Sequence, residues 1–370
     1  SGCISGLWCL ASWRRGETDS GDNVGQWTSI QVSEDGPPLV SYYDVTRKRL
    51  KFAFEDGGWS TFVLKEAPGA DIGRYSKMLI VDGKPVVAFL HVEPGNAGKM
   101  RSKIVLARSK VPTPRDAAAF SFEDVYVDEE GPCRADSCPG GQACVKGTGT
   151  CTPTVGGCAP ACGASEACVS VDNKATCVAV QGTVETYPRA VGAYISLASG
   201  PGGLGIAAYD AIRGNLLGFA EKGGAWERIL LDGETGSRAD QTALDIGDVG
   251  IATSLAIDGA GTWHLSYVNG IDETLRYLTV ENGKPGRPEV VDDGSSVDGQ
   301  AFPDGKHVVG DDSTLRADGD VVTIYYQDAT VGTLRRAVGT RSGATRKWDL
   351  RTLPQPNRFA GFFPQLVPGE

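Results

Sequence analysis

Short apolar segments recur along the chain in a fixed order, and each has the alternation or β-branched content of a strand. Each series opens with a glycine that is followed, five residues later, by an aliphatic residue. A second strand, a polar turn, a third strand, another turn and a closing strand come next. In the first series, Gly25 opens the pattern, and 40–44, 50–53 and 59–64 are the later strands. The pattern predicts a four-stranded antiparallel sheet whose consecutive strands are neighbours.

The opening phrase occurs six times along the chain. Its copies begin at Gly25, Gly73, Gly192, Gly250, Gly310 and Gly361. Four strands in a unit of about 50 residues are typical of a β-propeller blade, because each sheet buries its faces only against neighbouring copies. The sequence therefore predicts an all-β fold, a β-propeller of about six four-stranded blades. Closure with five or seven blades, and a β-sandwich, are the alternatives.

The two chain ends are expected to complete one blade together. Residues 361–367 have the pattern of one more first strand, and residues 10–18 resemble the closing strand at 227–235. A blade built from both ends leaves no open sheet edge. We therefore predict that the last blade is closed by N- and C-terminal strands.

A cysteine-rich segment separates the second and third copies of the repeat. Clustered cysteines in an even number predict disulfides in an oxidising compartment. Structural zinc is the alternative, but most gaps between these cysteines are wider than in zinc sites and the segment has no histidine. Eight cysteines form two similar groups near the middle and two more lie near the start: Cys133, Cys138, Cys144, Cys151; Cys158, Cys162, Cys168, Cys177; Cys3, Cys9.

Each group of four cysteines allows three pairings. We prefer first-to-third and second-to-fourth pairs within each group, and a pair between Cys3 and Cys9. A segment with so few apolar residues needs covalent cross-links to hold a shape. The predicted organisation is residues 1–130 for the N-terminal closing strand and blades 1 and 2, 131–180 for the cysteine-rich insert, and 181–370 for blades 3–5 and the closing first strand.

The repeat resembles a group of bacterial exported propellers whose units read S-Y-Y-D, L-K-Y-A and G-G-W. The resemblance is clearest at 41–44, 50–53 and 57–59. The insert is similar to tandem EGF-like or trypsin-inhibitor-like modules, although each half is shorter. The resemblance implies an exported propeller. It implies little about function, because propellers include binders, scaffolds and enzymes.

Composition removes several classes of protein. With 50 glycines, long helices are disfavoured, and a net charge of −10 without a basic stripe excludes nucleic acid as a partner. No apolar run approaches the roughly 18 residues of a transmembrane segment. We expect export to the periplasm, the cell surface or the medium. Ser1, Gly2 and Cys3 resemble the end of a lipobox, so lipoprotein anchoring is an alternative that we do not favour.

The sequence lacks the common catalytic motifs. Its three histidines are His91, His264 and His307, and it has no G-x-S-x-G, H-E-x-x-H or phosphate-binding loop. We expect a non-enzymatic binding or scaffold protein, a subunit whose partners are other proteins. Alternatives are a lectin-like carbohydrate-binding propeller and a sialidase-like glycoside hydrolase. For the hydrolase, the carboxylates nearest the starts of first strands are the candidates: Asp22, Asp71, Asp248 and Asp311.

Two further sets of residues are candidates for ligand binding. Aromatic residues at one phase of the repeat either line the channel mouth or pack between blades, and packing is favoured. Acidic loops at 292–298, 311–312 and 318–320 suit calcium, with solvated turns as the alternative, and no other cofactor is expected. The aromatic candidates are Trp27, Tyr75, Tyr194 and Phe363.

Overall fold

The computed structural model describes residues 22–32, 36–133, 138–180, 189–233, 248–343, 345–354 and 364. These residues are arranged in β-strands, and their only helical segments are two short 3-10 turns. The prediction of an all-β fold is therefore confirmed. No helix among these residues is long and apolar enough to span a membrane. Several predictions fall outside the described residues, namely those for Cys3, Cys9, Phe363, the strand at 10–18 and most of the strand at 361–367.

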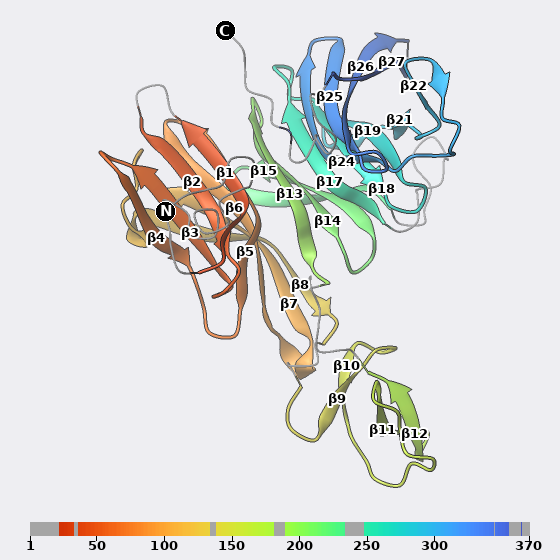
Figure 1. Ribbon diagram of the computed structural model, residues 1–370. Coiled ribbons are helices and arrows are strands. Elements are labelled where there is room, and N and C mark those ends of the chain that lie inside the picture. Colours follow the sequence, from red (N-terminus) through yellow and green to blue (C-terminus); the bar gives the residue numbers. More distant parts are fainter. Residues whose placement is uncertain are drawn as a thin grey trace, which may run out of the picture. The chain divides into compact units, whose positions relative to one another are not determined.

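The chain divides into two compact units, residues 1–191 and 192–370. The first unit contains two four-stranded antiparallel sheets in which every strand pairs with the next one along the chain (Figure 1). Their strands are β1 (Val24–Val32), β2 (Pro38–Asp44), β3 (Arg49–Glu55) and β4 (Trp59–Lys65), then β5 (Asp71–Val81), β6 (Lys84–Pro94), β7 (Met100–Ser109) and β8 (Phe120–Gly131).

The second unit contains three sheets of the same antiparallel order. The middle sheet has a divided outer edge, because two short strands, β20 and β21, both pair with β19. The strands are β13 (Val191–Gly200), β14 (Gly203–Asp210), β15 (Asn215–Lys222) and β16 (Ala225–Asp232); β17 (Val249–Ile257), β18 (Trp263–Asn269), β19 (Thr274–Glu281), β20 (Lys284–Pro285) and β21 (Glu289–Asp292); β24 (Val309–Asp318), β25 (Val321–Asp328), β26 (Thr333–Ser342) and β27 (Thr345–Thr352).

In four of the five described sheets, the polar residue that ends the second strand organises the turn behind it, whereas β6 ends at Pro94. The Asp44 carboxylate accepts a hydrogen bond from the Arg47 backbone N–H at 3.0 Å, and Asp328 accepts one from Thr330 at 3.1 Å. Asn269 receives the corresponding bond from Ile271 at 3.0 Å. Such side-chain bonds to the backbone two or three residues on stabilise tight turns. The aspartate of the S-Y-Y-D phrase is therefore a turn residue.

The opening glycine of the repeat marks a β-bulge. In β1 the register with β2 shifts twice, between Val24 and Gln26 and between Gln26 and Ser29. The glycine and the residue two positions later both have positive φ, and a side chain at Gly73 would place its Cβ 2.8 Å from Leu50. Glycine fits such a bulge because it has no Cβ. The pairs are Gly25 and Trp27, Gly73 and Tyr75, Gly192 and Tyr194, Gly250 and Ala252, and Gly310 and Asp312.

A serine four positions after the glycine links each sheet to the next one in its unit. The Met78 backbone N–H donates to Ser29 Oγ at 3.0 Å. In the second unit, Leu255 donates to Ser196 at 2.9 Å, and Leu315 donates to Ser254 at 3.2 Å. We call these three hydrogen bonds the serine links. The aliphatic residue of the phrase is therefore the donor of a bond between sheets.

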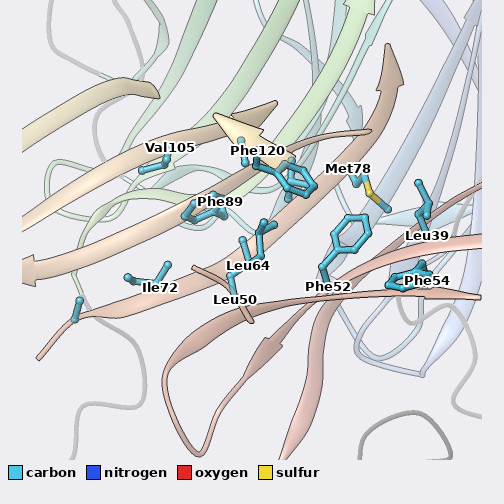
Figure 2. Close-up of a cluster of buried hydrophobic side chains, with 13 residues drawn as sticks. Leu39, Leu50, Phe52, Phe54, Leu64, Ile72, Met78, Phe89, Val105 and Phe120 are labelled. Carbon is cyan, nitrogen blue, oxygen red and sulfur yellow. The ribbon is translucent and has the colours of Figure 1, made fainter. Parts of the chain in front are cut away.

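The apolar core of the first unit lies between its two sheets (Figure 2). Phe52 and Leu39 come from the first sheet, and Met78 and Phe89 come from the second, and all four are almost fully buried. The phenyl rings of Phe52 and Phe120 meet edge to face at a centroid distance of 5.6 Å. Burial between sheets explains why each sheet is apolar on both faces.

The cysteine-rich insert, residues 132–180, follows β8 (Figure 1) and consists of two disulfide-bonded hairpins. Two isolated antiparallel β-bridges join the hairpins, one between Val145 and Val180 and one between Thr154 and Val169. Disulfides in this segment are confirmed, and each group pairs first to third and second to fourth, in the order that we prefer from the sequence. The hairpins are β9 (Gln142–Val145) with β10 (Thr150–Pro153) and β11 (Glu166–Val171) with β12 (Lys174–Ala179), and the disulfides are Cys133–Cys144, Cys138–Cys151, Cys158–Cys168 and Cys162–Cys177.

The insert is held against the loop between β6 and β7. A Cβ added to Gly98 would lie 2.2 Å from Cys151 Sγ, so the backbone of this loop packs directly on the Cys138–Cys151 disulfide. The Cys133 backbone N–H also donates to the Gly149 carbonyl at 2.8 Å, and Cys133 is fully buried. The first hairpin of the insert therefore continues the packing of the second sheet.

Candidate functional site

The aromatic residues predicted from the repeat lie at the bulges. Trp27 and Tyr75 come together in the first unit, with ring centroids 4.8 Å apart, and Trp27 is also 5.3 Å from Tyr43. The Arg74 guanidinium lies 5.3 Å from the Trp27 ring centroid, within cation–π range. Tyr75 is buried and Trp27 is half-buried. The two aromatic residues are therefore part of a packed cluster.

Tyr194 lies in the second unit, where its ring centroid is 6.2 Å from that of Tyr209. The equivalent residues in the next two copies of the repeat are Ala252 and Asp312. In the described part of the second unit, these positions are therefore not aromatic. Phe363 is outside the described residues. The four aromatic candidates are thus not gathered into one described site.

Two of the four candidate carboxylates accept tyrosine hydroxyls. Asp71 accepts from the Tyr43 hydroxyl at 2.8 Å and from Arg74 Nε at 2.9 Å, and it is buried. Asp248 accepts from the Tyr209 hydroxyl at 2.6 Å. Burial is the main cause that raises the pKa of each tyrosine, with the aspartate adding to it. These carboxylates act as structural acceptors.

The other two carboxylates differ from each other. Asp22 is ion-paired with Arg47 at 2.8 Å. Asp311 is half-buried, and its pKa is raised by burial and by the negative charge of Glu273. A raised carboxyl pKa suits proton donation. Burial and the nearby negative charge thus favour the protonated form of Asp311.

Two of the three histidines occupy polar positions between sheets. His264 Nδ1 lies 2.6 Å from the Tyr277 hydroxyl, and its Nε2 lies 3.2 Å from Asp258 Oδ2. His307 Nδ1 lies 2.7 Å from Asp328 Oδ2. His264, Tyr277 and Asp258 line a cavity of about 90 Å³. All three histidines are buried.

The acidic loops proposed for calcium are bonded to other protein groups. Asp293 accepts from the backbone and hydroxyl of Ser295, and Asp318 pairs with Arg316 at 2.7 Å. Within the described ranges, the groups of three or more metal-ligating side chains whose ligand atoms lie within 4.8 Å of one another consist of disulfide-bonded cysteines. Calcium binding stays a prediction.

A larger cleft of about 410 Å³ lies in the second unit, between a short hairpin and β27. The hairpin consists of β22 (Ser296–Val297) and β23 (Gln300–Ala301), joined by Asp298 and Gly299. Both turn residues have positive φ, 51° and 73°, as a two-residue hairpin turn requires. The lining residues are Ser296, Val297, Asp298, Gly299, Trp348, Asp349, Leu350 and Arg351.

The charged groups of the cleft are close to one another and exposed. Arg351 Nε lies 3.3 Å from Asp349 Oδ2, and Arg351 Nη1 lies 3.7 Å from Asp298 Oδ1. The exposed fractions of the Arg351, Asp349 and Asp298 side chains are 53%, 58% and 41%. Hydrogen bonding to Asp349 raises the pKa of Arg351. The cleft thus has a solvent-accessible polar rim.

Trp348 is one of the residues that line the cleft, and its ring packs against the core cluster of the second unit. A Cβ added to Gly339, its partner across β26 and β27, would lie 2.5 Å from the indole ring. The Trp348 ring meets the buried Tyr277 ring edge to face at a centroid distance of 5.3 Å. The indole is therefore held between a bare backbone and a buried aromatic ring.

Sequence reasoning did not find this cleft. It assigned 292–298 to an acidic loop. The available signal was the dipeptide Asp298-Gly299, because Asp-Gly is typical of a two-residue hairpin turn. Nothing in the sequence indicated that the hairpin would face a strand about 50 residues away.

No family model and no curated protein matches the chain. Solved structures that it resembles include an α-L-arabinofuranosidase from Lactobacillus brevis, with 12% identity over 93% of this chain and 94% of that chain and a TM-score of 0.40. An α-L-arabinanase from Cellvibrio cellulosa in complex with arabinohexaose has 9% identity over 89% and 96%, with a TM-score of 0.34. AofleA from Arthrobotrys oligospora has 12% identity over 93% of each chain, with a TM-score of 0.30. At these scores the likeness assigns no activity to this chain.

Proposed function

We propose that the chain is an exported, non-enzymatic β-propeller that binds carbohydrate in the cleft between the β22–β23 hairpin and β27. The observation that supports this proposal is the cleft itself. Its volume of about 410 Å³ lies within the usual range of small-ligand sites, which is about 300–1,000 Å³. A pyranose ring carries a rim of hydroxyls, and three charged side chains line the cleft together with Trp348.

A binding role suits the polar groups better than a catalytic role. Glycoside hydrolysis needs one carboxylic acid that donates a proton beside one carboxylate. Asp349 and Asp298 both lie beside the Arg351 guanidinium, which is an arrangement for acceptors. Asp311, whose pKa is raised, does not line the cleft.

The propeller part of the proposal is supported by the repeated construction of the sheets. Five sheets share the antiparallel order and the glycine bulge, and three neighbouring pairs share the serine link. First strands contact each other within both units, as in β1 with β5 and β17 with β24. A radial stack of about six such sheets is the arrangement that satisfies these contacts in every copy.

The proposal is tested by screening the full chain on a glycan array and measuring the affinity of each hit by calorimetry. Trp348→Ala removes the aromatic side chain that lines the cleft, and we expect at least tenfold weaker binding. Trp59→Ala is the matched control, because Trp59 is 42% exposed on β4 and lies outside the cleft. Equal losses in the two variants, or no glycan bound by the wild-type chain, would contradict the proposal.

A second function, contact with another protein through the insert, is favoured by the way that the insert is held. Its two hairpins are cross-linked by four disulfides, and the first is packed on Gly98 of the sheet. A segment that is already ordered loses little conformational entropy when it binds a partner. Light scattering of protein purified from its native source without reductant checks it. A mass well above 38.9 kDa supports assembly, and a monomer of 38.9 kDa contradicts it.

A further inference from the structure

We infer that the cleft between the β22–β23 hairpin and β27 selects neutral sugars and rejects anionic ones, with Arg351 as the positioning residue for its two carboxylates. The inference rests on the proposed carbohydrate binding and adds the class of ligand. It follows from which charges line the cleft and from how they are already paired.

The cleft has one more negative than positive charge. Of its lining residues, Asp298 and Asp349 are acidic and Arg351 is basic. Arg351 already faces both carboxylates, at 3.7 Å and 3.3 Å. A uronate or sialate carboxylate would therefore have to displace an aspartate from this guanidinium and would add a second like charge. Like charges a few Å apart repel each other even in water, which corresponds to about tenfold weaker binding for the anionic sugar.

The same carboxylates favour hydroxyl groups. An ionised carboxylate is only an acceptor, and it needs a donor such as a sugar O–H. A sugar carboxylate has no hydrogen to offer to it. Hydrogen bonds from hydroxyls to ionised carboxylates are short and stronger than neutral ones. The rim therefore recognises hydroxyl-rich, uncharged rings.

Arg351 and the hairpin turn fix where these acceptors lie. Arg351 lies between the two carboxylates, and the Thr352 backbone N–H donates to Asp298 Oδ2 at 3.4 Å. The tip of the hairpin is thereby attached to β27. Replacing Arg351 would remove its ion pairs with both carboxylates and leave Asp298 bonded to the Thr352 N–H, so the effect on binding is indirect.

The test compares neutral and anionic sugars of matched size on the full chain. The probes are 1,4-linked galactotriose and cellotriose against trigalacturonic acid and a glucuronic acid trimer, titrated by calorimetry. We expect the neutral trimers to bind at least about tenfold more tightly. Added salt screens repulsion, so the affinity for the acidic trimers rises with ionic strength while that for the neutral ones stays nearly constant.

Variants assign the preference to the cleft. Asp349→Asn keeps the shape of the side chain and removes its charge, so the ratio of neutral to anionic affinity should fall about tenfold. Arg351→Gln should weaken the neutral trimers, because the two acceptors lose their common partner. Asp318→Asn is the control, since Asp318 is an exposed carboxylate outside the cleft.

The outcomes separate this inference from the proposed function. If the acidic trimers bind as tightly as the neutral ones or more tightly, carbohydrate binding stands and the inference is wrong. If no trimer and no glycan on the array binds, both are wrong. If Asp349→Asn leaves the ratio unchanged while Trp348→Ala abolishes binding, the charge argument is wrong.

Discussion

Buried tyrosine–aspartate pairs join neighbouring sheets in the second unit. The Tyr267 hydroxyl donates to Asp232 Oδ2, and the Tyr326 hydroxyl donates to Asp292 Oδ2, both at 2.7 Å. In each pair the aspartate ends the outer strand of one sheet and the tyrosine belongs to the second strand of the next. Burial is the main cause that raises the pKa of Tyr326 far above its ordinary value. The Tyr326 hydroxyl therefore remains a neutral donor to Asp292.

A buried arginine strengthens the second of these pairs, and its loss should be costly. Arg335 donates to Asp292 at 2.8 Å and to Asp328, and all three side chains are almost fully buried. Asp292→Asn removes the negative charge of one of the two ion pairs of the buried guanidinium, and we expect it to lower the free energy of unfolding by about 3 kcal/mol. Urea titration of the full chain measures it.

The control for Asp292→Asn is a carboxylate with the same kind of partner in solvent. Asp318→Asn removes an exposed pair with Arg316, and its effect should stay below about 1 kcal/mol. Similar losses in the two variants would show that burial of the Asp292 network does not set its strength.

His264 should make the fold less stable in mild acid. Burial lowers the pKa of His264, although Asp258 opposes this effect, and Arg346 and Glu281 also face the ring. His264 Nε2–H donates to Asp258, so Nδ1 accepts from Tyr277, which suits the neutral ring. Below about pH 6.5 the unfolded chain takes up a proton that the folded chain does not, and stability falls by up to about 1.4 kcal/mol per pH unit until the folded pKa is reached.

Urea unfolding between about pH 8 and about pH 5.5 checks this prediction, because carboxyl groups of the unfolded chain titrate near pH 4 and contribute little there. His264→Gln should show a shallower decrease than the wild-type chain. Burial also lowers the pKa of His91, so some decrease should remain. An unchanged slope in His264→Gln would exclude this histidine as a cause.

At the scale of elements, the bulge and the serine link explain the repeated phrase. The bulge frees the carbonyl of its left-handed residue, and the next sheet supplies a hydroxyl: Ser76 donates to the Trp27 carbonyl at 2.8 Å, and Ser313 donates to that of Ala252 at 3.1 Å. The backbone strain of an aromatic residue at positive φ is thus compensated by a bond between sheets. The left-handed residue of the bulge therefore has a structural role.

Removing one serine link should destabilise the contact between two sheets. Ser254→Ala leaves the buried Leu315 N–H without its acceptor, and we expect a loss of about 1–3 kcal/mol. Hydrogen exchange at Leu315 should also become faster. Ser342→Ala, at an exposed position of β26, is the control and should be nearly neutral. Unchanged exchange at Leu315 would contradict the assigned role.

The strands were predictable and the candidate site was not, for physical reasons. Strand order follows from alternation and turn residues, which are local signals. The left-handed Trp27 was not foreseen, because a bulky residue rarely adopts positive φ. The cleft at Trp348 depends on a hairpin packed on a strand distant in sequence, and local patterns do not report such contacts.

For the whole molecule, one exposed residue points to the closure that the sequence predicts. Ile30 is 46% exposed, whereas Met78, Leu197, Leu255 and Leu315 at the same position of the repeat are 2%, 7%, 7% and 7% exposed. Met78, Leu255 and Leu315 each follow another sheet in their own unit, and their core clusters include residues of that preceding sheet. Ile30 follows no described sheet, so we expect residues 361–367 and 10–18 to cover it.

A photo-reactive benzoylphenylalanine in place of Ile30 tests this closure. We expect cross-links within one chain to peptides that contain residues 361–367 or 10–18, identified by mass spectrometry. Incorporation at Trp59, exposed on β4, is the control and should give no such products. Cross-links that join two chains would indicate that a second copy covers Ile30, and closure within the chain would be wrong.

The serine links also bear on how the copies have drifted apart. In each link one partner is a side-chain hydroxyl and the other is a backbone N–H, from Met78, Leu255 or Leu315. A backbone donor is present in any residue except proline, so each link constrains one side chain where a bond between two side chains would constrain two. After an ancestral duplication, a substitution at the donor position leaves the bond intact. The repeats can therefore accumulate differences one copy at a time while neighbouring sheets stay joined.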